Sequence, residues 1–305
     1  MSSAPTVSVI IAARDYGEHL PTALASVSAQ TLQDWECIIV DDASSDGTPR
    51  IAAEAVAKDK RFRSIRFDAN VGVSAARNRG IAEAQGRYVQ FLDADDAIAP
   101  EKLARQAAFL DAHPVAALVC SDFAHFTSAP DFGQPGEHHG DEKLDGAGGA
   151  VVNRLLKGNV IRLNTALVRA SAVRSVGGFR EQFRAVEDWH LWLMLAGTGH
   201  RFAFLDDAAC LSAVRVNPRG LSKDGPGMRR WHLPVLQDLW GRGSLDFFMR
   251  MEILVRYADF LLEMRLIKRE PAILLPLRRT AFLLQLVPIT LAITPFWLFA
   301  RPFRR

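Results

Sequence analysis

The stretch Cys37-Ile38-Ile39-Val40-Asp41-Asp42 runs from four apolar residues directly into two carboxylates. A continuous apolar run of this kind is typical of a β-strand that is covered on both faces. Further strand-like runs occur at Val7–Ile11, Ser64–Phe67 and Tyr88–Leu92. The last of these continues into Asp93-Ala94-Asp95-Asp96, so two of the four predicted strands end in acidic residues.

Helical patterns lie between these strands. Leu20, Leu24 and Val27 recur at the spacing of one helix face, and residues 50–58 and 75–84 are further helical stretches. Strands that alternate with helices predict an α/β fold with a doubly wound, Rossmann-like parallel sheet. Ligands of such sheets bind beyond the carboxyl ends of the strands, which is where the acidic residues are expected.

Composition narrows the class of protein. The chain has 305 residues, and 49% of them are hydrophobic, which is enough for a sizeable core. A net charge of +3 gives no indication of nucleic-acid binding. Cys37, Cys120 and Cys210 are too widely spaced for a metal site or a disulfide framework, which favours a reduced, intracellular compartment. No Gly-x-Gly-x-x-Gly follows a strand, which argues against a dehydrogenase.

Five motifs, taken in order, resemble glycosyltransferase family 2. They are Val7–Ile11, residues 39–48 (IVDDASSDGT), residues 70–80 (NVGVSAARNRG), Phe91–Asp96 and Val186–Trp189. Each motif is weak by itself, but the ordered set is specific and covers about the first 220 residues. The resemblance implies the GT-A fold, and the transfer of a sugar from a nucleotide-sugar donor with inversion at the anomeric carbon.

The cluster Asp93–Asp96 is the expected metal site. Three carboxylates within four residues repel one another, and Mg²⁺ or Mn²⁺ would remove that penalty while leaving positions for phosphate oxygens. The resemblance makes Asp95 the direct metal ligand. It places Asp93 on ribose or on a metal-bound water, with Ala94 in the same donor-binding stretch. The alternative is a polar turn before a helix, with Asp96 as its cap.

Two further donor-binding residues follow from the resemblance. Asp42 is assigned to the nucleotide base, and because a carboxylate accepts the N3–H of uracil, a UDP or dTDP donor is favoured. The alternative role for Asp42 is to cap the following turn. Arg77 is assigned to the neighbourhood of the diphosphate, and its alternative role is a surface ion pair.

Two donor-binding segments depart from the family pattern. Ala12–Tyr16 replaces the usual Pro-x-Tyr-Asn type of segment, and the resemblance still places Ala12 and Tyr16 at the donor, with Tyr16 stacked on the base. Residues 215–222 resemble a segment that folds over the bound donor, where Arg215 or Arg219 would meet the diphosphate. Asn217 stands there in place of a histidine found in many members.

Asp188 corresponds to the catalytic base of the family. An acceptor hydroxyl has a very high pKa, so its attack on the anomeric carbon needs proton removal as the bond forms. A carboxylate opposite the leaving diphosphate does this in one inverting displacement. Glu187 is the neighbouring candidate. Alternatively, both acids stabilise the N-terminus of a predicted amphipathic helix over residues 189–195.

The family resemblance covers the chain up to about residue 220, and beyond Ser222 the sequence pattern changes to that of long helices. We therefore divide the chain into two parts. Residues 1–222 form the predicted glycosyltransferase domain, with a nucleotide-sugar-binding half (1–110) and an acceptor-binding half (111–222). Residues 223–305 form a predicted helical extension. Its segment 282–300 is overwhelmingly apolar, interrupted by two prolines and flanked by arginines. It either lies in the membrane interface, which would place residues 271–305 on the membrane, or spans the bilayer, or packs within the protein.

These features predict a metal-dependent, inverting glycosyltransferase on the cytoplasmic face of the cell membrane, either peripheral or anchored. Its acceptor would be a hydroxyl of a lipid-linked or surface-polysaccharide glycan. Arg230-Trp231 lacks the glutamine of processive synthases, which favours one sugar per encounter. The alternatives are a nucleotidyltransferase, and a non-catalytic nucleotide-sugar-binding or scaffold protein of a membrane polysaccharide assembly. The sequence specifies neither the sugar, nor the acceptor, nor the oligomeric state.

Overall fold

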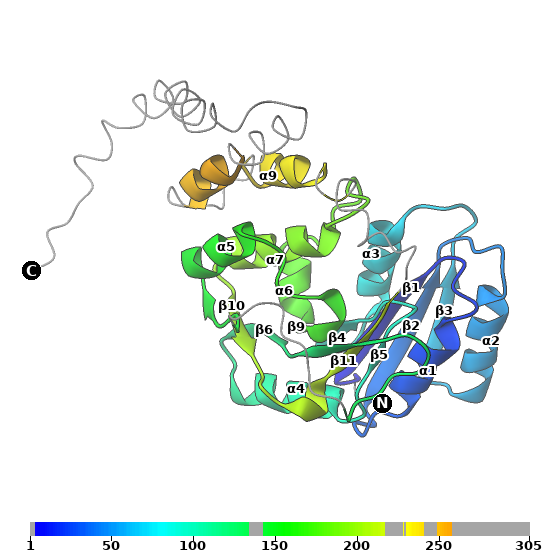
Figure 1. Ribbon diagram of the computed structural model, residues 1–305. Helices are drawn as coiled ribbons and strands as arrows, with labels where there is room; N and C mark the ends of the chain where they lie inside the picture. The colour runs from blue at the N-terminus through cyan, green and yellow to red at the C-terminus, as the bar shows by residue number, and fades with distance from the viewer. Residues whose placement is uncertain (1–3, 134–142, 217–227, 229, 241–248, 258–305) are drawn as a thin grey trace, which may run out of the picture. The chain divides into compact units, whose positions relative to one another are not determined.

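The computed structural model describes residues 4–133, 143–216, 228, 230–240 and 249–257. Within them, an eight-stranded sheet has the strand order β3-β2-β1-β4-β9-β6-β10-β8, and a three-stranded sheet has the order β5-β11-β7 (Figure 1). The chain divides into two compact units, residues 1–250 and 251–305. All the strands and helices named below lie in the first unit.

The large sheet consists of β1 (Val7–Ala13), β2 (Trp35–Asp41), β3 (Phe62–Arg66), β4 (Tyr88–Phe91), β6 (Ala116–Cys120), β8 (Gly146–Ala147), β9 (Leu167–Arg169) and β10 (Arg201–Phe204). The small sheet consists of β5 (Ala97–Ile98), β7 (Phe123–Phe126) and β11 (Ser212–Arg215). The helices are α1 (Leu20–Ser28), α2 (Thr48–Lys58), α3 (Val73–Glu83), α4 (Lys102–Ala112), α5 (Gly149–Leu156), α6 (Ala170–Ser175), α7 (Glu187–Gly197) and α9 (His232–Trp240). The described residues also include the 3-10 turns η1 (Leu163–Thr165) and η2 (Ala208–Cys210).

The four predicted strands of the N-terminal half form as β1 to β4, and neighbours among them pair in parallel. The predicted parallel pairing therefore holds for these four strands, but it does not extend to the whole sheet. Strand β9 is antiparallel to both β4 and β6, and β8 is antiparallel to β10. These two strands have three and two residues, which is too short for an apolar run that a sequence pattern can identify. The sheet is therefore mixed.

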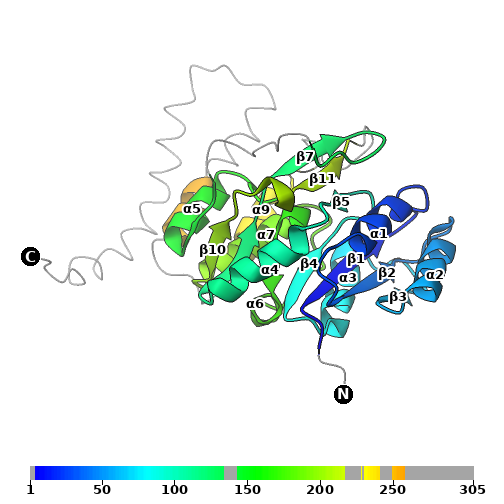
Figure 2. The same cartoon turned by 90° about the horizontal axis from the view of Figure 1, so that it is seen from below.

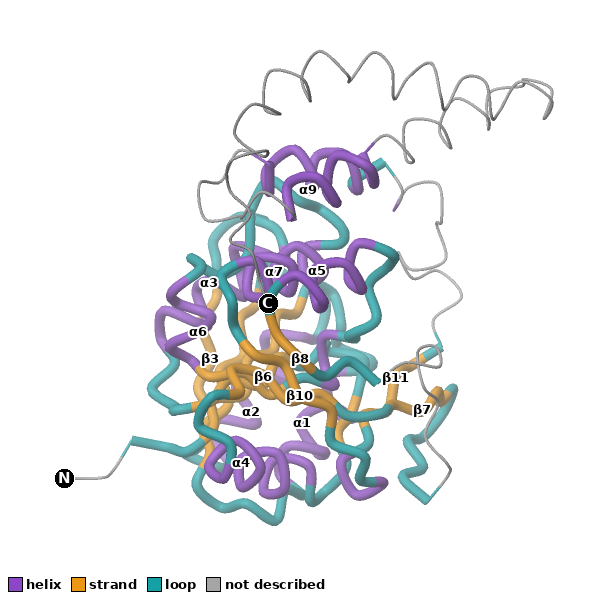
Figure 3. Tube along the Cα trace, turned by 90° about the vertical axis from the view of Figure 1, so that its left-hand side faces the viewer, coloured by secondary structure: helices purple, strands orange, loops and turns teal. Residues whose placement is uncertain are grey.

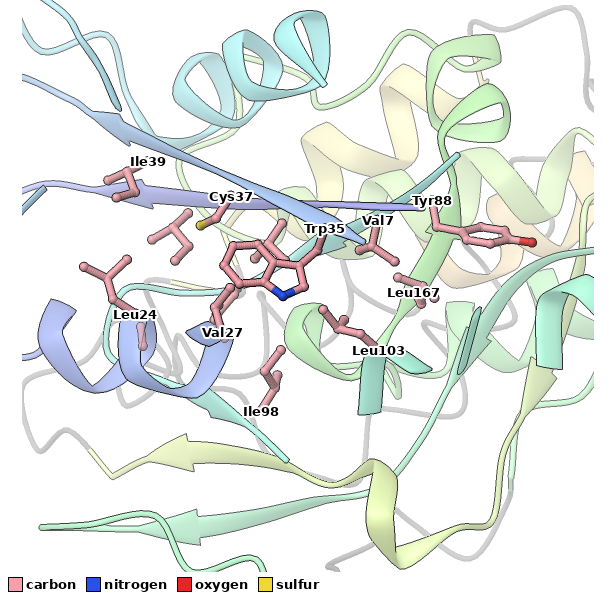
Figure 4. Close-up of a cluster of buried hydrophobic side chains, with 14 of the residues drawn as sticks. Val7, Leu24, Val27, Trp35, Cys37, Ile39, Tyr88, Ile98, Leu103 and Leu167 are labelled. Atoms are coloured by element: carbon pink, nitrogen blue, oxygen red, sulfur yellow. The ribbon is translucent and has the colours of Figure 1, made fainter. Parts of the chain in front are cut away.

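Strand β1 is buried on both faces, which explains its continuous apolar run. On one face Val7 lies in a core with side chains from α1 and α4, among them Val27 and Leu103 (Figure 4). On the other face Gly80 of α3 packs against Ile10. Helices α1 and α4 cover one side of the sheet (Figure 2), and α3 and α6 lie on the opposite side (Figure 3).

The predicted C-terminal features fall on residues that the structure does not describe. These are the boundary after residue 222, the apolar segment 282–300 and the membrane-binding stretch 271–305. Among the described helices, none combines the length and the apolar character needed to cross a bilayer. Membrane association therefore stays a prediction.

Candidate active site

The carboxyl ends of β1, β2 and β4 meet at one edge of the large sheet. Strand β1 lies between the other two and pairs in parallel with both. The amide of Asp42 donates to the carbonyl of Ala13, and the amide of Leu92 donates to that of Ile10. The acidic residues that follow β2 and β4 therefore lie at the same edge, as the predicted topology requires.

The buried Asp42 carboxylate holds the loop that leads into α3. It accepts hydrogen bonds from the side-chain amide of Asn70 and from the backbone N–H groups of Val71 (2.7 Å) and Gly72 (2.9 Å). The turn after β2 is capped instead by Asp41, which accepts from a backbone amide of that turn. A carboxylate has about four acceptor positions, so Asp42 retains room for one more donor, such as a nucleotide base.

The acidic cluster forms a turn in which the amide of Asp96 donates to the carbonyl of Asp93 (3.1 Å). The Asp96 side chain points into the protein, where it accepts from the amide of Arg215 and from Asn164 Nδ2, both at 2.7 Å. Burial, followed by the charges of Asp93 and Asp95, raises the pKa of Asp96 well above its usual value. Asp96 thus connects the loop to β11 and η1, which the cap hypothesis did not anticipate.

Asp93 and Asp95 form a donor set that fits a hard cation. Burial, followed by the charge of Asp93, raises the pKa of Asp95, and a bound cation would offset both effects. Among the described residues, no group of three or more His, Cys, Asp and Glu side chains is arranged to hold a metal. Two carboxylates nevertheless suit Mg²⁺ or Mn²⁺ when phosphate oxygens and water fill the other positions.

Arg77 joins this loop to a distant part of the chain. Its Nη2 donates to Asp93 Oδ1 (2.7 Å) and its Nη1 donates to Glu187 Oε1 (2.6 Å). The Arg77 side chain is 7% exposed, so the surface-pair alternative does not hold. These two ion pairs bring the end of β4 and the start of α7 into one site.

Tyr16 also lies at the acidic loop, despite the altered segment after β1. Burial, followed by the charges of Asp95, Asp93 and Asp96, raises the pKa of Tyr16 to about 12. Ala12, which lies near the end of β1, is half-buried. Stacking of Tyr16 on a nucleotide base stays a prediction.

Arg215, the last residue of β11, forms a hydrogen bond with the backbone of the acidic loop. Its Nε donates to the carbonyl of Asp95 (3.1 Å), and its Nη1 donates to the carbonyl of Thr127 (2.8 Å). Two of its five N–H groups are therefore held by backbone carbonyls within the described part of the chain. Asn217 and Arg219 lie outside the described residues.

The first turn of α7 carries Asp188. Val186, directly before this helix, has φ 56° and ψ 23°, a left-handed conformation that β-branched residues rarely adopt. Asp188 accepts from the amide of Trp189 (2.7 Å) and from Asn159 Nδ2 (2.8 Å). Burial, followed by the charge of Glu187, raises the pKa of Asp188 to about 7. A carboxylate of this kind is suited to remove a proton near neutral pH.

This arrangement occurs within a known family. Residues 8–168, more than half of the chain, match the model of the family described as "Glycosyl transferase family 2". The chain belongs to glycosyltransferase family 2.

Relatives of this family 2 glycosyltransferase include proteins named for polysaccharide synthesis. The chain is 32% identical over 219 residues to the Bacillus subtilis protein named "Putative glycosyltransferase EpsE", covering 68% of the chain and 73% of that protein. It is 38% identical over 108 residues to the Rhizobium meliloti "Succinoglycan biosynthesis protein ExoO". That match covers 35% of this chain and 30% of ExoO, so it spans less than a third of that relative.

Solved structures show the same fold. S. aureus TarS 1–349 in complex with UDP-GlcNAc aligns over 84% of this glycosyltransferase and 71% of its own chain, with a TM-score of 0.65 at 19% identity. The mannosyltransferase PcManGT from Pyrobaculum calidifontis, in complex with GDP-Man and Mn²⁺, aligns over 95% of this chain and 81% of its own. Its TM-score is 0.56 at 18% identity. The likeness is that of a GT-A α/β fold.

Three features of the glycosyltransferase site were not predicted from the sequence. Asn159 and Asn164 belong to no motif, and the strain at Val186 has no sequence signal.

The prediction of an amphipathic helix is wrong, because α7 is buried continuously from Trp189 to Gly197. Helices α5, α6 and α9 pack around it, so its sequence is apolar on every side.

Proposed function

We propose that this glycosyltransferase moves a sugar from a UDP or dTDP donor to a hydroxyl of a lipid-linked or surface-polysaccharide acceptor. It would transfer one sugar per encounter and invert the anomeric configuration. The observation that carries the proposal is the double ion pair of Arg77 with Asp93 and Glu187. Each partner of Arg77 stands within two residues of a proposed functional carboxylate, Asp95 on one side and Asp188 on the other.

The donor would occupy the edge formed by the ends of β1, β2 and β4. The residues assigned to it are Ala12, Tyr16, Asp42, Arg77, Asp93, Ala94, Asp95 and Arg215. Asp95 and Asp93 would hold Mg²⁺ or Mn²⁺, which would neutralise charge on the departing diphosphate. The raised pKa of Asp95 supports this assignment, because burial next to Asp93 makes a bare carboxylate unfavourable. The PcManGT structure, a complex with Mn²⁺, is consistent with it.

Asp188 would act as the general base on the acceptor. It takes the proton of the acceptor hydroxyl as that oxygen bonds to the anomeric carbon. The bond from this carbon to the diphosphate oxygen breaks at the same time, and its electron pair leaves with the diphosphate. The first-turn position on α7 and the raised pKa of Asp188 support this role, because an efficient base has a pKa near the working pH.

The chemical class of donor and acceptor rests on two observations. The free acceptor position on Asp42 suits the N3–H of uracil or thymine, and the TarS structure contains UDP-GlcNAc. The name of ExoO refers to the synthesis of succinoglycan, a polysaccharide. The GDP-Man of PcManGT makes a guanosine donor the comparison to include in any test.

The test is nucleotide release by the purified chain from UDP-glucose, UDP-GlcNAc, dTDP-glucose and GDP-mannose, with Mn²⁺ or with EDTA. We expect release from a uridine or thymidine donor that requires the metal, and a loss on the order of 10²-fold or more in Asp95→Ala. Glu54→Ala, which removes an exposed acid of α2, should retain the wild-type rate. Binding of UDP without turnover of any donor would contradict the proposal, and an undiminished rate in EDTA would refute its metal requirement.

A further inference from the structure

Asp188 is held by two donors that differ in origin. Its Oδ1 accepts from the amide of Trp189, the next residue along the chain, and its Oδ2 accepts from Asn159 Nδ2 at 2.8 Å. The first bond is built into the helix that carries Asp188. The second comes from the loop between α5 and η1, so Asn159 is the contact that fixes the carboxylate relative to the rest of the site.

The amide of Asn159 has a defined orientation. Its Oδ1 accepts from the backbone N–H of Ile161 (3.3 Å), so the oxygen of the amide is engaged on that side. The amino group must therefore be the part that faces Asp188. An amide in this orientation donates to the ionised carboxylate and cannot itself take up the acceptor proton.

The loop that carries Asn159 is attached to α7 on both sides of that residue. The indole of Trp189 donates to the carbonyl of Leu155 (2.7 Å), and the indole of Trp192 donates to the carbonyl of Ile161 (3.1 Å). Both tryptophans are almost completely buried. Helices α5 and α7 also pack side by side (Figure 3). Helix α7 therefore positions both Asp188, which it carries, and Asn159, whose loop it holds.

The charged and polar groups near Asp188 have opposite effects on its pKa. Glu187 raises the pKa of Asp188, while the hydrogen bonds from Trp189 and Asn159 and the charge of Arg77 lower it. The other titratable groups on the helices that pack against α7 include Arg154 on α5, Arg174 on α6, and His232 and Asp238 on α9. Asn159, from the loop before η1, donates to Asp188 through its side chain.

We infer that Asn159 is a positioning residue for the base: it aims the Asp188 carboxylate at the acceptor hydroxyl and favours its ionised form. The inference rests on the proposed role of Asp188. Asn159 would act entirely through that carboxylate and would not touch the donor.

The test is the pH profile of kcat/KM for Asn159→Asp and Asn159→Ala beside the wild type. The aspartate side chain of Asn159→Asp has nearly the same shape as asparagine. It replaces the amide group that donates a hydrogen bond to Asp188 by a second carboxylate, which disfavours ionisation of Asp188. We expect its acid limb to move to higher pH, with a rate at pH 7 roughly tenfold or more below wild type and partial recovery at pH 8.5. Asn159→Ala should shift the limb in the same direction by less.

Three measurements separate positioning from a general structural effect. UDP affinity of Asn159→Asp should stay close to wild type, and so should its thermal midpoint at pH 5.5, where Asp188 is protonated in both proteins. Asn153→Asp introduces the same change on α5 without altering a hydrogen bond of Asp188 in the described chain, so its limb should not move. A uniform loss of rate at every pH, or an unmoved limb in Asn159→Asp, would overturn the inference.

Asp188→Asn, measured in parallel, distinguishes failure of the base assignment from failure of its positioning residue. If Asp188→Asn is inactive and the Asn159 variants keep the wild-type limb, the inference about Asn159 fails while the base assignment stands. If Asp188→Asn keeps the wild-type rate, the base assignment fails and the role of Asn159 fails with it.

Discussion

At the scale of single residues, the ionisation of Asp188 should control how activity depends on pH. Burial and the charge of Glu187 raise the pKa of Asp188 to about 7. Below that pH the carboxyl is protonated and cannot accept a proton, so kcat/KM should fall about tenfold for each further pH unit. Above it, the base is ionised and the rate should be flat until another group titrates. A pH–rate profile of the wild type checks the position of this limb.

Glu187→Gln should move the same limb in the opposite direction from the Asn159 variants. Removing the negative charge of Glu187 leaves Arg77 with one carboxylate partner, and both changes favour ionised Asp188. The midpoint of the acid limb should therefore shift to lower pH, even if the maximal rate declines because α7 loses its link to Arg77. A limb that stays in place, or rises, would show that Glu187 does not act on the base.

The ordered motifs identified the residues that converge, but not all of their contacts. Arg77 and Asp93 were predicted at the donor, and the structure brings both to the acidic loop. The second partner of Arg77 is 110 residues away in the sequence, and a contact of this range leaves no periodicity or spacing to detect. The same holds for Asn159 and for Asn164, whose partner Asp96 was expected in the acidic cluster, with a local cap as its alternative role.

At the scale of elements, the packing of α3 on β1 depends on Gly80. A Cβ at this position would lie 2.4 Å from Cγ2 of Ile10, a buried β-branched residue that has little freedom to move. Gly80→Ala should therefore destabilise the fold by about 1–3 kcal/mol, although alanine is the better helix former. In contrast, Gly149→Ala in α5 meets nothing within 4 Å and should be stabilising by roughly 0.5–1 kcal/mol. Urea denaturation of both variants compares them, and equal stabilities would contradict this explanation.

Buried Lys102 links α4 to its surroundings and should make stability depend on pH. Its Nζ lies within hydrogen-bond distance of Gln106, Ser121 and the carbonyl of Thr165, and burial lowers its pKa to about 7. Above pH 7 the folded state has released a proton that the unfolded lysine, with a pKa near 10.5, retains. Stability should therefore rise with pH, by at most about 1.4 kcal/mol per unit.

Urea unfolding at pH 7.5 and pH 8.5 checks this prediction for Lys102. The interval lies below the ordinary cysteine pKa of 9.0, where the buried thiols would begin to lower stability as pH rises. The wild type should gain about 1 kcal/mol across the interval, and Lys102→Met should lose that gain. The same slope in both proteins would mean that Lys102 remains charged in the folded state.

The sequence predicted the long elements well and the short ones poorly. Apolar runs predicted β1 to β4, and helical patterns predicted α1 to α3. Strands β5, β7, β8, β9 and β11 have two to four residues, and tertiary pairing rather than local pattern places them. Antiparallel β9, which no sequence pattern predicted, makes the sheet mixed beyond the parallel strands β1 to β4.

At the scale of the whole molecule, membrane attachment is the prediction that depends on sequence alone. The stretch 271–305 combines apolar residues with Arg278, Arg279, Arg301 and Arg304. The 305-residue chain should co-sediment with vesicles that contain anionic lipid, and high salt should weaken that binding. Replacing Arg278, Arg279 and Arg301 by glutamate should reduce it by about fivefold or more per residue. Equal binding to neutral vesicles, unaffected by salt, would contradict an electrostatic contribution.

The proposed catalysis depends on the Asp188 carboxylate, and the decisive quantity is the rate of sugar transfer by Asp188→Asn at saturating donor. The amide keeps the size and the helix position of Asp188 but cannot remove a proton. We predict a loss on the order of 10²- to 10⁴-fold, with UDP affinity unchanged by calorimetry. A variant that transfers sugar at the wild-type rate would contradict the assignment of Asp188 as the base.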